Sequence, residues 1–211
     1  MKKNTLKTAG ALISALILLL SFTSCSSKLK LKGSKIVDPK TGSEYVYVPG
    51  NFIPKSVSEE VYATFRYNGV SVKYFEIEGL KPTEWLYSEI GDLIYSGNEK
   101  LPTFTEFGAK KMFICYNNDV MFSLAEISNS DSLAEIIKCY NEGEKLSPNY
   151  FNANTYRLIF ESDSYKSIYY MLNLVVTPEG YFIYNRFEGY MVDAGDLLSP
   201  YVEPYSYAED Y

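Results

Sequence analysis

The amino-acid sequence predicts an α+β fold: a mostly antiparallel β-sheet made of hairpins, with one or two helices packed on it. Two observations favour the sheet. β-rich segments flank short turn sequences in the middle of the chain, and three more such segments follow one another near its C-terminal end. A third observation favours a helix lying on the sheet, namely a capping signal followed by apolar residues at helical spacing.

The composition divides the chain into four segments. Residues 1–24 are expected to form an export signal, residues 25–40 a basic linker, residues 41–198 a single folded domain, and residues 199–211 an extended or disordered tail. The part that remains after removal of the signal is long enough to bury a sizeable hydrophobic core without the help of disulfides.

The first strand is expected at Tyr45–Val48 and the first hairpin over residues 61–77. This hairpin turns at Asn68-Gly69, a pair typical of a type I′ turn because both turn positions need a positive φ. A two-residue turn there pairs Tyr67 with Val70, Phe65 with Val72 and Ala63 with Tyr74. One face of the hairpin is then core-facing and the other faces water.

A short helix is expected over residues 83–90, with Thr83 as its N-cap and Gly91 as its end. Its apolar side would hold Trp85, Leu86 and Ile90. The segment 92–108 is expected to be irregular, although Leu93–Tyr95 is compatible with a short strand.

A second hairpin is expected from Lys111–Tyr116 and Val120–Ile127, with its turn at Asn118-Asp119. This turn would pair Cys115 with Phe122 and Tyr116 with Met121. Because both faces are then largely apolar, the hairpin is expected in the middle of a sheet that is covered on each side.

The most strongly indicated helix spans residues 132–142. Ser132-x-x-Glu135 matches a capping box, and Gly143 stands where a glycine commonly follows a helix. The apolar positions are Leu133, Ile136, Ile137 and Tyr140. They form a one-sided stripe, so the helix should lie on the sheet.

Three strands are expected in the last third: Thr155–Glu161, Ser167–Thr177 and Tyr181–Phe187, with a turn at Pro178-Glu179. The core-facing residues of the middle strand would be Ile168, Tyr170, Leu172, Leu174 and Val176. A two-residue loop would bring neighbouring pairs onto the opposite face: Asn173 beside Tyr184, Met171 beside Arg186, and Tyr169 beside Glu188.

Aromatic rings beside a forked cation, an amide and a carboxylate suit the binding of a peptide or a glycan. The candidate binding residues are therefore Tyr169, Asn173, Tyr184, Arg186 and Glu188. The alternative is ordinary cross-strand packing with an Arg–Glu ion pair.

The N-terminus has the pattern of an export signal. Three lysines precede the apolar run Ala9–Leu20, which is shorter than the roughly 20 apolar residues that span a membrane. Phe22-Thr23-Ser24-Cys25 then resembles the lipobox of bacterial lipoproteins, although that family usually has Leu at the position of Phe22. The resemblance covers residues 1–25 only. It implies cleavage before Cys25, a diacylglycerol on Cys25, and an extracytoplasmic protein anchored to a bacterial membrane.

Two alternatives to a lipid anchor are left open: an ordinary secretory signal with an unrelated cysteine, and an N-terminal helix that is not cleaved. Two acyl chains hold a protein stably on a membrane, whereas one binds only marginally. The membrane is thus an expected partner through the lipid on Cys25.

The charge of the mature chain is uneven. Without the signal it carries 17 basic and 26 acidic residues, a net charge of −9. Five lysines gather in the expected linker: Lys28, Lys30, Lys32, Lys35 and Lys40. They would suit anionic headgroups, or merely keep a linker solvated. From residue 41 onward the balance is 12 basic to 25 acidic, which disfavours nucleic acid as a partner.

Several kinds of chemistry are disfavoured. The chain has no His, which excludes imidazole-dependent triads and removes the commonest zinc ligand. No phosphate-binding loop, EF-hand spacing or cysteine pair at metal spacing occurs, so no metal and no cofactor are expected. Cys115 and Cys139 could form a disulfide or stay free.

Three functional hypotheses follow. The first is a non-catalytic binding or interaction module of the cell envelope, with a protein or a glycan as its partner. The second is an immunity or inhibitor lipoprotein whose acidic domain blocks a basic protein. The third is an envelope hydrolase that uses paired carboxylates, although the sequence selects no catalytic pair.

Overall fold

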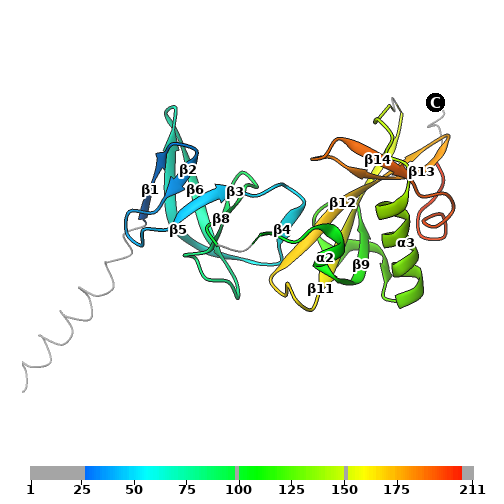
Figure 1. The fold of residues 1–211 in the computed structure, drawn as a ribbon, viewed down its shortest axis with the longest axis horizontal. Helices are drawn as coiled ribbons and strands as arrows, with labels where there is room; N and C mark the ends of the chain where they lie inside the picture. Colours follow the sequence, from blue (N-terminus) through cyan, green and yellow to red (C-terminus); the bar gives the residue numbers. More distant parts are fainter. Residues whose placement is uncertain (1–26, 98–99, 150–151, 206–211) are drawn as a thin grey trace, which may run out of the picture.

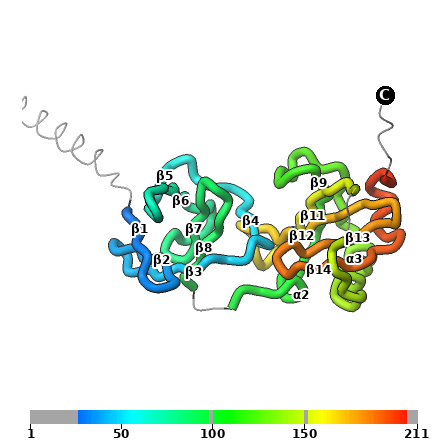
Figure 2. The backbone as a smooth tube through the Cα atoms, turned by 90° about the horizontal axis from the view of Figure 1, so that it is seen from above, coloured from blue at the N-terminus to red at the C-terminus, as the bar shows by residue number. Residues whose placement is uncertain are grey.

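The computed structural model describes residues 27–97, 100–149 and 152–205. This part of the chain forms a closed barrel and an open sheet that lie side by side (Figure 1, Figure 2). Strands far exceed helices, so the predicted predominance of β-structure with few helices is confirmed. The predicted single sheet of hairpins is wrong, because the first hairpin belongs to the barrel and the later ones to the sheet.

The barrel contains seven strands. In their order around the barrel they are β1 (Ser27–Lys32), β2 (Lys35–Val37), β3 (Glu44–Tyr47), β8 (Leu93–Tyr95), β7 (Trp85–Ser88), β6 (Val70–Ile77) and β5 (Val57–Tyr67). Neighbours are antiparallel except β1 and β5, whose parallel pairing closes the barrel. Its interior is filled by Leu29, Ile36, Tyr45, Ala63, Phe65, Tyr74, Leu86 and Ile94.

The segment expected to be a basic linker forms β1 and β2 instead. Its alternating Lys and Leu residues have the period of a strand: Leu29 is buried inside the barrel, while Lys28 and Lys30 are exposed. The segment lacks a hydrophobic run, which is why composition alone indicated a linker. The lysines therefore lie on the outer surface of a folded barrel.

The first hairpin is confirmed. β5 and β6 pair in the predicted register, from Tyr67 opposite Val70 to Ala63 opposite Tyr74. Asn68 and Gly69 both have positive φ, 48° and 85°, as a type I′ turn requires.

The short helix expected over residues 83–90 is wrong. Trp85 and Leu86 belong to β7, where they pair with Tyr95 and Ile94 of β8. Both side chains are buried although they point to opposite faces, because one face lines the barrel and the other meets the sheet. β8 begins eight residues after the start of β7. The strand pairing outweighs the local helix preference of the segment, so it forms a strand.

The sheet runs in the order β10-β9-β11-β12-β13-β14, and β4 pairs with the other end of β12. Its strands are β4 (Phe52–Pro54), β9 (Ala109–Cys115), β10 (Ser123–Ile127), β11 (Asn154–Ser162), β12 (Ile168–Thr177), β13 (Gly180–Asn185) and β14 (Tyr190–Asp193). All neighbouring pairs are antiparallel. The described helices are α2 (Phe104–Phe107), α3 (Ser130–Glu142) and the 3-10 turn η1 (Val120–Phe122).

α3 confirms the predicted helix and lies on one face of the sheet (Figure 1). It begins three residues earlier than the capping box suggested, because Asn129 is the N-cap and accepts hydrogen bonds from the N–H groups of Asp131 and Ser132. The second hairpin has a different register from the predicted one: Ser123 lies opposite Cys115, and Val120–Phe122 form η1. β10 is an edge strand and not a central one.

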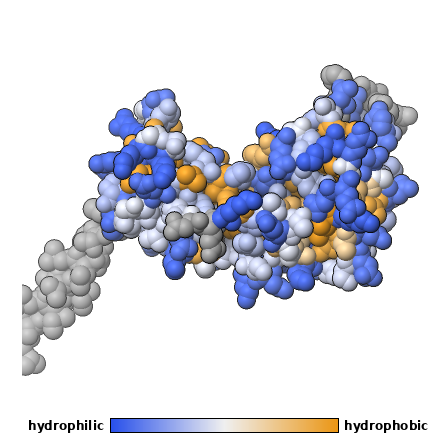
Figure 3. Space-filling model, viewed as in Figure 1, coloured by the Kyte–Doolittle hydropathy of each residue, from blue (hydrophilic) through white to orange (hydrophobic). Residues whose placement is uncertain are grey.

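One hydrophobic core connects the sheet with the barrel. It joins Phe104, Phe160 and Tyr170, which meet edge to face or tilted at 4.7–5.1 Å, with Ile77, Trp85 and Leu93 of the barrel. The beginning of the expected tail belongs to it as well, since Val202 is buried against this core. In Figure 3, hydrophobic side chains are visible where the barrel meets the sheet.

A buried carboxylate holds the closing strands of the barrel together. Asp38 follows β2 and is fully buried. It accepts hydrogen bonds from the hydroxyls of Ser27 in β1, Tyr62 in β5 and Thr41, and from the N–H of Lys40. Burial alone would raise the pKa of Asp38, but these hydrogen bonds outweigh it and the pKa lies below its ordinary value.

The expected export signal (residues 1–24), the lipidated Cys25 and the last residues of the expected tail (206–211) lie outside the described residues. Among the residues that are described, no helix has the length and apolar character needed to cross a membrane.

Candidate anion-binding site

The face of the sheet opposite α3 is the one on which a binding surface was expected. It carries its own small apolar cluster, formed by Ile53, Phe113, Cys115 and Ile159 with Val120, Tyr169 and Met171 packed against them. This cluster covers one end of the face. The polar residues of the face lie beside it, across β11, β12 and β13.

Four residues lie side by side in register across four strands, and we refer to them as the Arg157 row. They are Cys115, Arg157, Asn173 and Tyr184. Asn173 and Tyr184 are the neighbours that the sequence predicted. Arg157 was not predicted, and it brings a guanidinium to the centre of the row.

Arg157 is held in place by the side chain of Asn173. The guanidinium donates a hydrogen bond to the amide oxygen of Asn173. The amide nitrogen of Asn173 donates in turn to the backbone oxygen of Tyr184, at 3.4 Å. Because Asn173 is buried, this arrangement fixes the guanidinium close to the surface while leaving several of its five N–H donors for another acceptor.

Arg186 approaches this row from the turn between β13 and β14. Burial lowers the pKa of Arg157 below its ordinary value, and the nearby positive charge of Arg186 lowers it further. The guanidinium still remains protonated near neutral pH. The two arginines are therefore near enough for their like charges to repel, on an acidic protein that has only three arginines. We refer to them as the arginine pair.

A buried polar network fixes the turn that carries Arg186. The side-chain oxygen of Asn185, which is fully buried, accepts hydrogen bonds from the N–H groups of Phe187 and Glu188, both at 3.1 Å, and from the Asn51 amide. Its amide nitrogen donates to the Tyr140 hydroxyl of α3 at 2.8 Å. The turn is thus tied to the core on both sides.

The bend before β4 packs against the same turn. A Cβ added to Gly50 would come within 2.0 Å of the Phe187 ring, so any other residue there would displace that ring. This close approach and the Asn185 network together restrict where Arg186 can lie.

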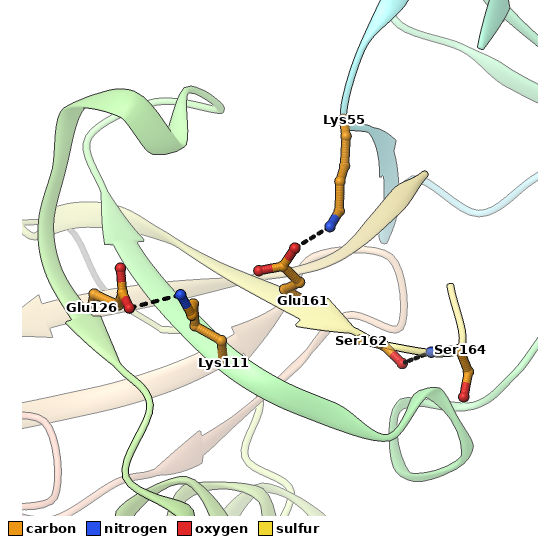
Figure 4. Close-up of polar contacts among 6 residues, drawn as sticks. All are labelled: Lys55, Lys111, Glu126, Glu161, Ser162 and Ser164. Atoms are coloured by element: carbon orange, nitrogen blue, oxygen red, sulfur yellow. Dashed lines mark hydrogen bonds and ion pairs between the residues drawn. The ribbon is translucent and has the colours of Figure 1, made fainter. Parts of the chain in front are cut away.

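Two ion pairs also lie on this face. Figure 4 shows Lys111 of β9 beside Glu126 of β10, at 2.8 Å, and Lys55 in an ion pair with Glu161 of β11. Lys55 comes from the segment between β4 and β5 and also lies 4.8 Å from the centre of the Tyr169 ring. By contrast, among the described residues no carboxylate lies within ion-pair distance of Arg157 or Arg186.

Two of the expected neighbour pairs are wrong. β13 ends at Asn185, so Arg186 and Glu188 lie in a turn, and β12 pairs with β4 beyond that point. Tyr169 therefore lies opposite Ile53, under Lys55. Glu188 lies close to Tyr140 and Tyr190 on the α3 side, where burial and its negative charge raise the pKa of both tyrosines.

Arg157 could have been found from the sequence. In Tyr156-Arg-Leu158, the flanking residues alternate with it and are core-facing, so Arg157 must face the other side of the sheet, as Asn173 does. What the sequence does not supply is the register between β11 and β12, which places these two residues opposite each other.

The cysteines and carboxylates of the described residues form no further candidate site for redox chemistry or metal binding. Cys115 and Cys139 are both free thiols, and they lie on opposite sides of the sheet. Within the described ranges, no three Cys, Asp or Glu side chains gather closely enough to hold a metal ion.

Searches for similar proteins found none: no family model, curated protein or solved structure matches this chain.

Proposed function

We propose that this protein is a lipid-anchored, non-catalytic binding protein of the bacterial cell envelope, and that Arg157 and Arg186 bind a carboxylate of its ligand. The supporting observation is the arginine pair. Two like charges brought together beside a partly buried surface repel each other, and an anion held between them would offset that cost. Arginine presents paired N–H donors that match the two oxygens of a carboxylate.

The overall charge limits the kind of anion. The mature chain has a net charge of −9, so its long-range field repels polyanions. A ligand with one carboxylate, such as a peptide C-terminus or a sugar acid, suffers little of this repulsion. The half-buried ring of Tyr184 next to the arginines offers an apolar surface for the part of the ligand beside that carboxylate.

The barrel supports the proposed position at a membrane. β1 begins at Ser27, so a lipid on Cys25 would leave only Ser26 between the anchor and the first strand. The barrel itself, and not a flexible linker, would then lie against the headgroups. Lys28 and Lys30 are exposed on β1, and each lysine near an anionic surface contributes about 1 kcal/mol.

The anchor is tested by fractionating cells that express the wild-type protein or a Cys25→Ser variant. The proposal expects the wild-type protein in the membrane fraction and the variant released from it. If both stay equally in the membrane, the lipid anchor is contradicted.

The binding site is tested with purified full-length protein in mild detergent. The probes are acetyl-alanyl-alanine and galacturonic acid, each with one carboxylate but from two different sources, and binding is followed by calorimetry. Hydrogen bonds to charged groups contribute about 1.5–3 kcal/mol, so Arg157→Gln should weaken binding of the preferred probe roughly 10- to 100-fold. Arg186→Gln should weaken it less, because Arg186 is exposed.

Arg66, the third arginine of the chain, provides the control variant for these binding measurements. Arg66 is exposed on the barrel hairpin, opposite Ser71, and Arg66→Gln removes the same charge far from the Arg157 row. It should bind like the wild type. Equal losses in all three variants would show a general charge effect and would contradict a site at Arg157.

A crosslinking pull-down from intact cells separates this proposal from the inhibitor hypothesis. If one basic protein is recovered in a one-to-one ratio, and Arg157→Gln recovers it equally well, the result favours an inhibitor and contradicts the proposal. If Arg157→Gln no longer recovers the partner that the wild type recovers, the result supports the proposal.

A further inference from the structure

A cavity of about 370 Å³ lies where the barrel meets the sheet, away from the Arg157 row. Its volume falls within the roughly 300–1,000 Å³ typical of small-molecule sites, which occur preferentially at such junctions. Leu80, Trp85 and Tyr95 line it from the barrel, and Tyr165 and Ile168 line it from the sheet. Leu101 lines it from the segment between β8 and α2. Neither part of the molecule forms the cavity alone.

Each side of the cavity contributes an aromatic ring that is backed by a second ring. Tyr95 lies against Trp85 with ring centres 4.3 Å apart, and Tyr165 stacks on Phe107 at 5.2 Å. Gly97 lets the Tyr95 ring lie across the backbone, since a Cβ there would come within 1.8 Å of the Tyr95 hydroxyl oxygen. Each of the two tyrosine rings thus packs against a second ring, and such packing restricts its movement and lowers the entropy cost of binding.

A second cavity of about 740 Å³ adjoins the first. Glu84 and Tyr95 line both, so the two cavities are neighbours on the same side of the junction. Ser43, Thr83 and Ser96 line the second cavity, and Ser164 and Ser167 line the first. The lining thus combines aromatic surfaces with many hydrogen-bonding groups.

Among the described residues that line the two cavities, positive and negative charges are equal in number. Lys35, Lys100 and Lys166 stand against Glu44, Glu84 and Asp163. This balance disfavours a strongly charged ligand. A sugar ring has an apolar face that packs on aromatic rings and hydroxyls that meet polar side chains, so we infer that the two cavities bind a neutral oligosaccharide. This inference does not depend on the carboxylate site.

Trp85 makes the inference measurable. It is the only tryptophan of the chain and it lines the first cavity, so its fluorescence should change when a ligand binds there to the folded protein. The full-length protein in mild detergent is titrated with the trimer of N-acetylglucosamine and with cellotriose, and the heat of binding is measured in parallel. The expected result is a saturable change with at least one trimer and weaker binding of the corresponding monosaccharide.

Variants then locate the binding. Tyr165→Ala removes one aromatic wall and should weaken binding at least tenfold, whereas Tyr67→Ala, which removes an exposed tyrosine from the barrel hairpin, should not. If Tyr165→Ala lowers the melting temperature, Ser164→Leu provides a second test, because it narrows the cavity without removing a buried group. Arg157→Gln should leave saccharide binding unchanged.

Two results would overturn the inference. One is the absence of both heat and fluorescence change with either trimer at millimolar concentration. The other is binding that survives both Tyr165→Ala and Ser164→Leu. If the wild-type protein binds neither saccharide trimer but does bind the carboxylate probe, this inference is contradicted and the proposed function still stands.

Discussion

The barrel and the sheet are stabilised by different interactions between their strands. Eight side chains fill the barrel, whereas the core of the sheet, which extends into the junction, contains 27 buried residues. Four of the seven barrel strands have only three or four residues, and a buried carboxylate, Asp38, connects the strands that close it. The sheet has strands of up to ten residues and an aromatic core. The barrel, with the smaller apolar core, thus adds polar connections, whereas the sheet relies on a larger buried apolar area.

The largest expected effect tests whether the two parts share one core. Phe160 is fully buried in the sheet, 4.7 Å from the Phe104 ring, and Phe160→Ala should lower the free energy of unfolding by about 3–5 kcal/mol. Because the core continues to Trp85, denaturation followed by Trp85 fluorescence and by circular dichroism should shift together. A shift in only one of these signals would show that barrel and sheet unfold independently.

The next effect is specific to the barrel and depends on pH. Asp38→Ala leaves hydroxyl and N–H donors without their acceptor, which should cost about 1–3 kcal/mol for the buried groups affected. The folded pKa of Asp38 lies below its ordinary value of 3.8, so its contribution is present above that value and is lost as the pH falls through the folded pKa.

The expected measurement is the melting temperature between neutral pH and pH 2. The wild type should lose stability in the acid range, and part of that loss should be missing in Asp38→Asn, because the amide does not titrate. An identical acid loss in both proteins would mean that Asp38 does not contribute to closing the barrel.

The smallest effect compares two ion pairs on the sheet. Lys55 and Glu161 are both largely shielded from solvent and connect the segment leading to the barrel with β11, so Lys55→Met should cost about 1 kcal/mol. Lys111→Met removes the more exposed pair with Glu126 and should leave chemical denaturation curves unchanged. Similar losses of unfolding free energy in both variants would show that Lys55 contributes no more to stability than a surface ion pair does.

The sheet could be predicted from the sequence far better than the barrel. In the sheet, Pro178-Glu179 sets the register of its hairpin locally, and Thr177 does lie opposite Gly180 as a two-residue loop requires. In the barrel, Asn68-Gly69 does the same for the β5–β6 hairpin alone. The helix at 130–142 also has a strong local pattern. The barrel depends on pairing between short strands distant in sequence, such as β1 with β5, which no local pattern reveals.

The candidate site shows the same limit. Asn173 beside Tyr184 followed from one turn, but Arg157 beside Asn173 needed the register of β11, and Glu188 was misplaced because β13 ends at Asn185. A local turn allows the neighbours of residues close to it to be predicted. A site that combines residues from three strands and a turn also needs the register between strands distant in sequence, which a local pattern does not supply.

The most direct test of the carboxylate site changes the ligand and leaves the protein untouched. Binding of acetyl-alanyl-alanine to the full-length protein is compared with binding of its C-terminal amide, in which an uncharged group replaces the carboxylate. The account predicts saturable binding of the acid, loss of that binding as the pH falls below about 4, where the carboxylate is protonated, and no detectable binding of the amide. Equal affinity for acid and amide, in the wild type and in Arg157→Gln, would contradict an anion site at the arginine pair.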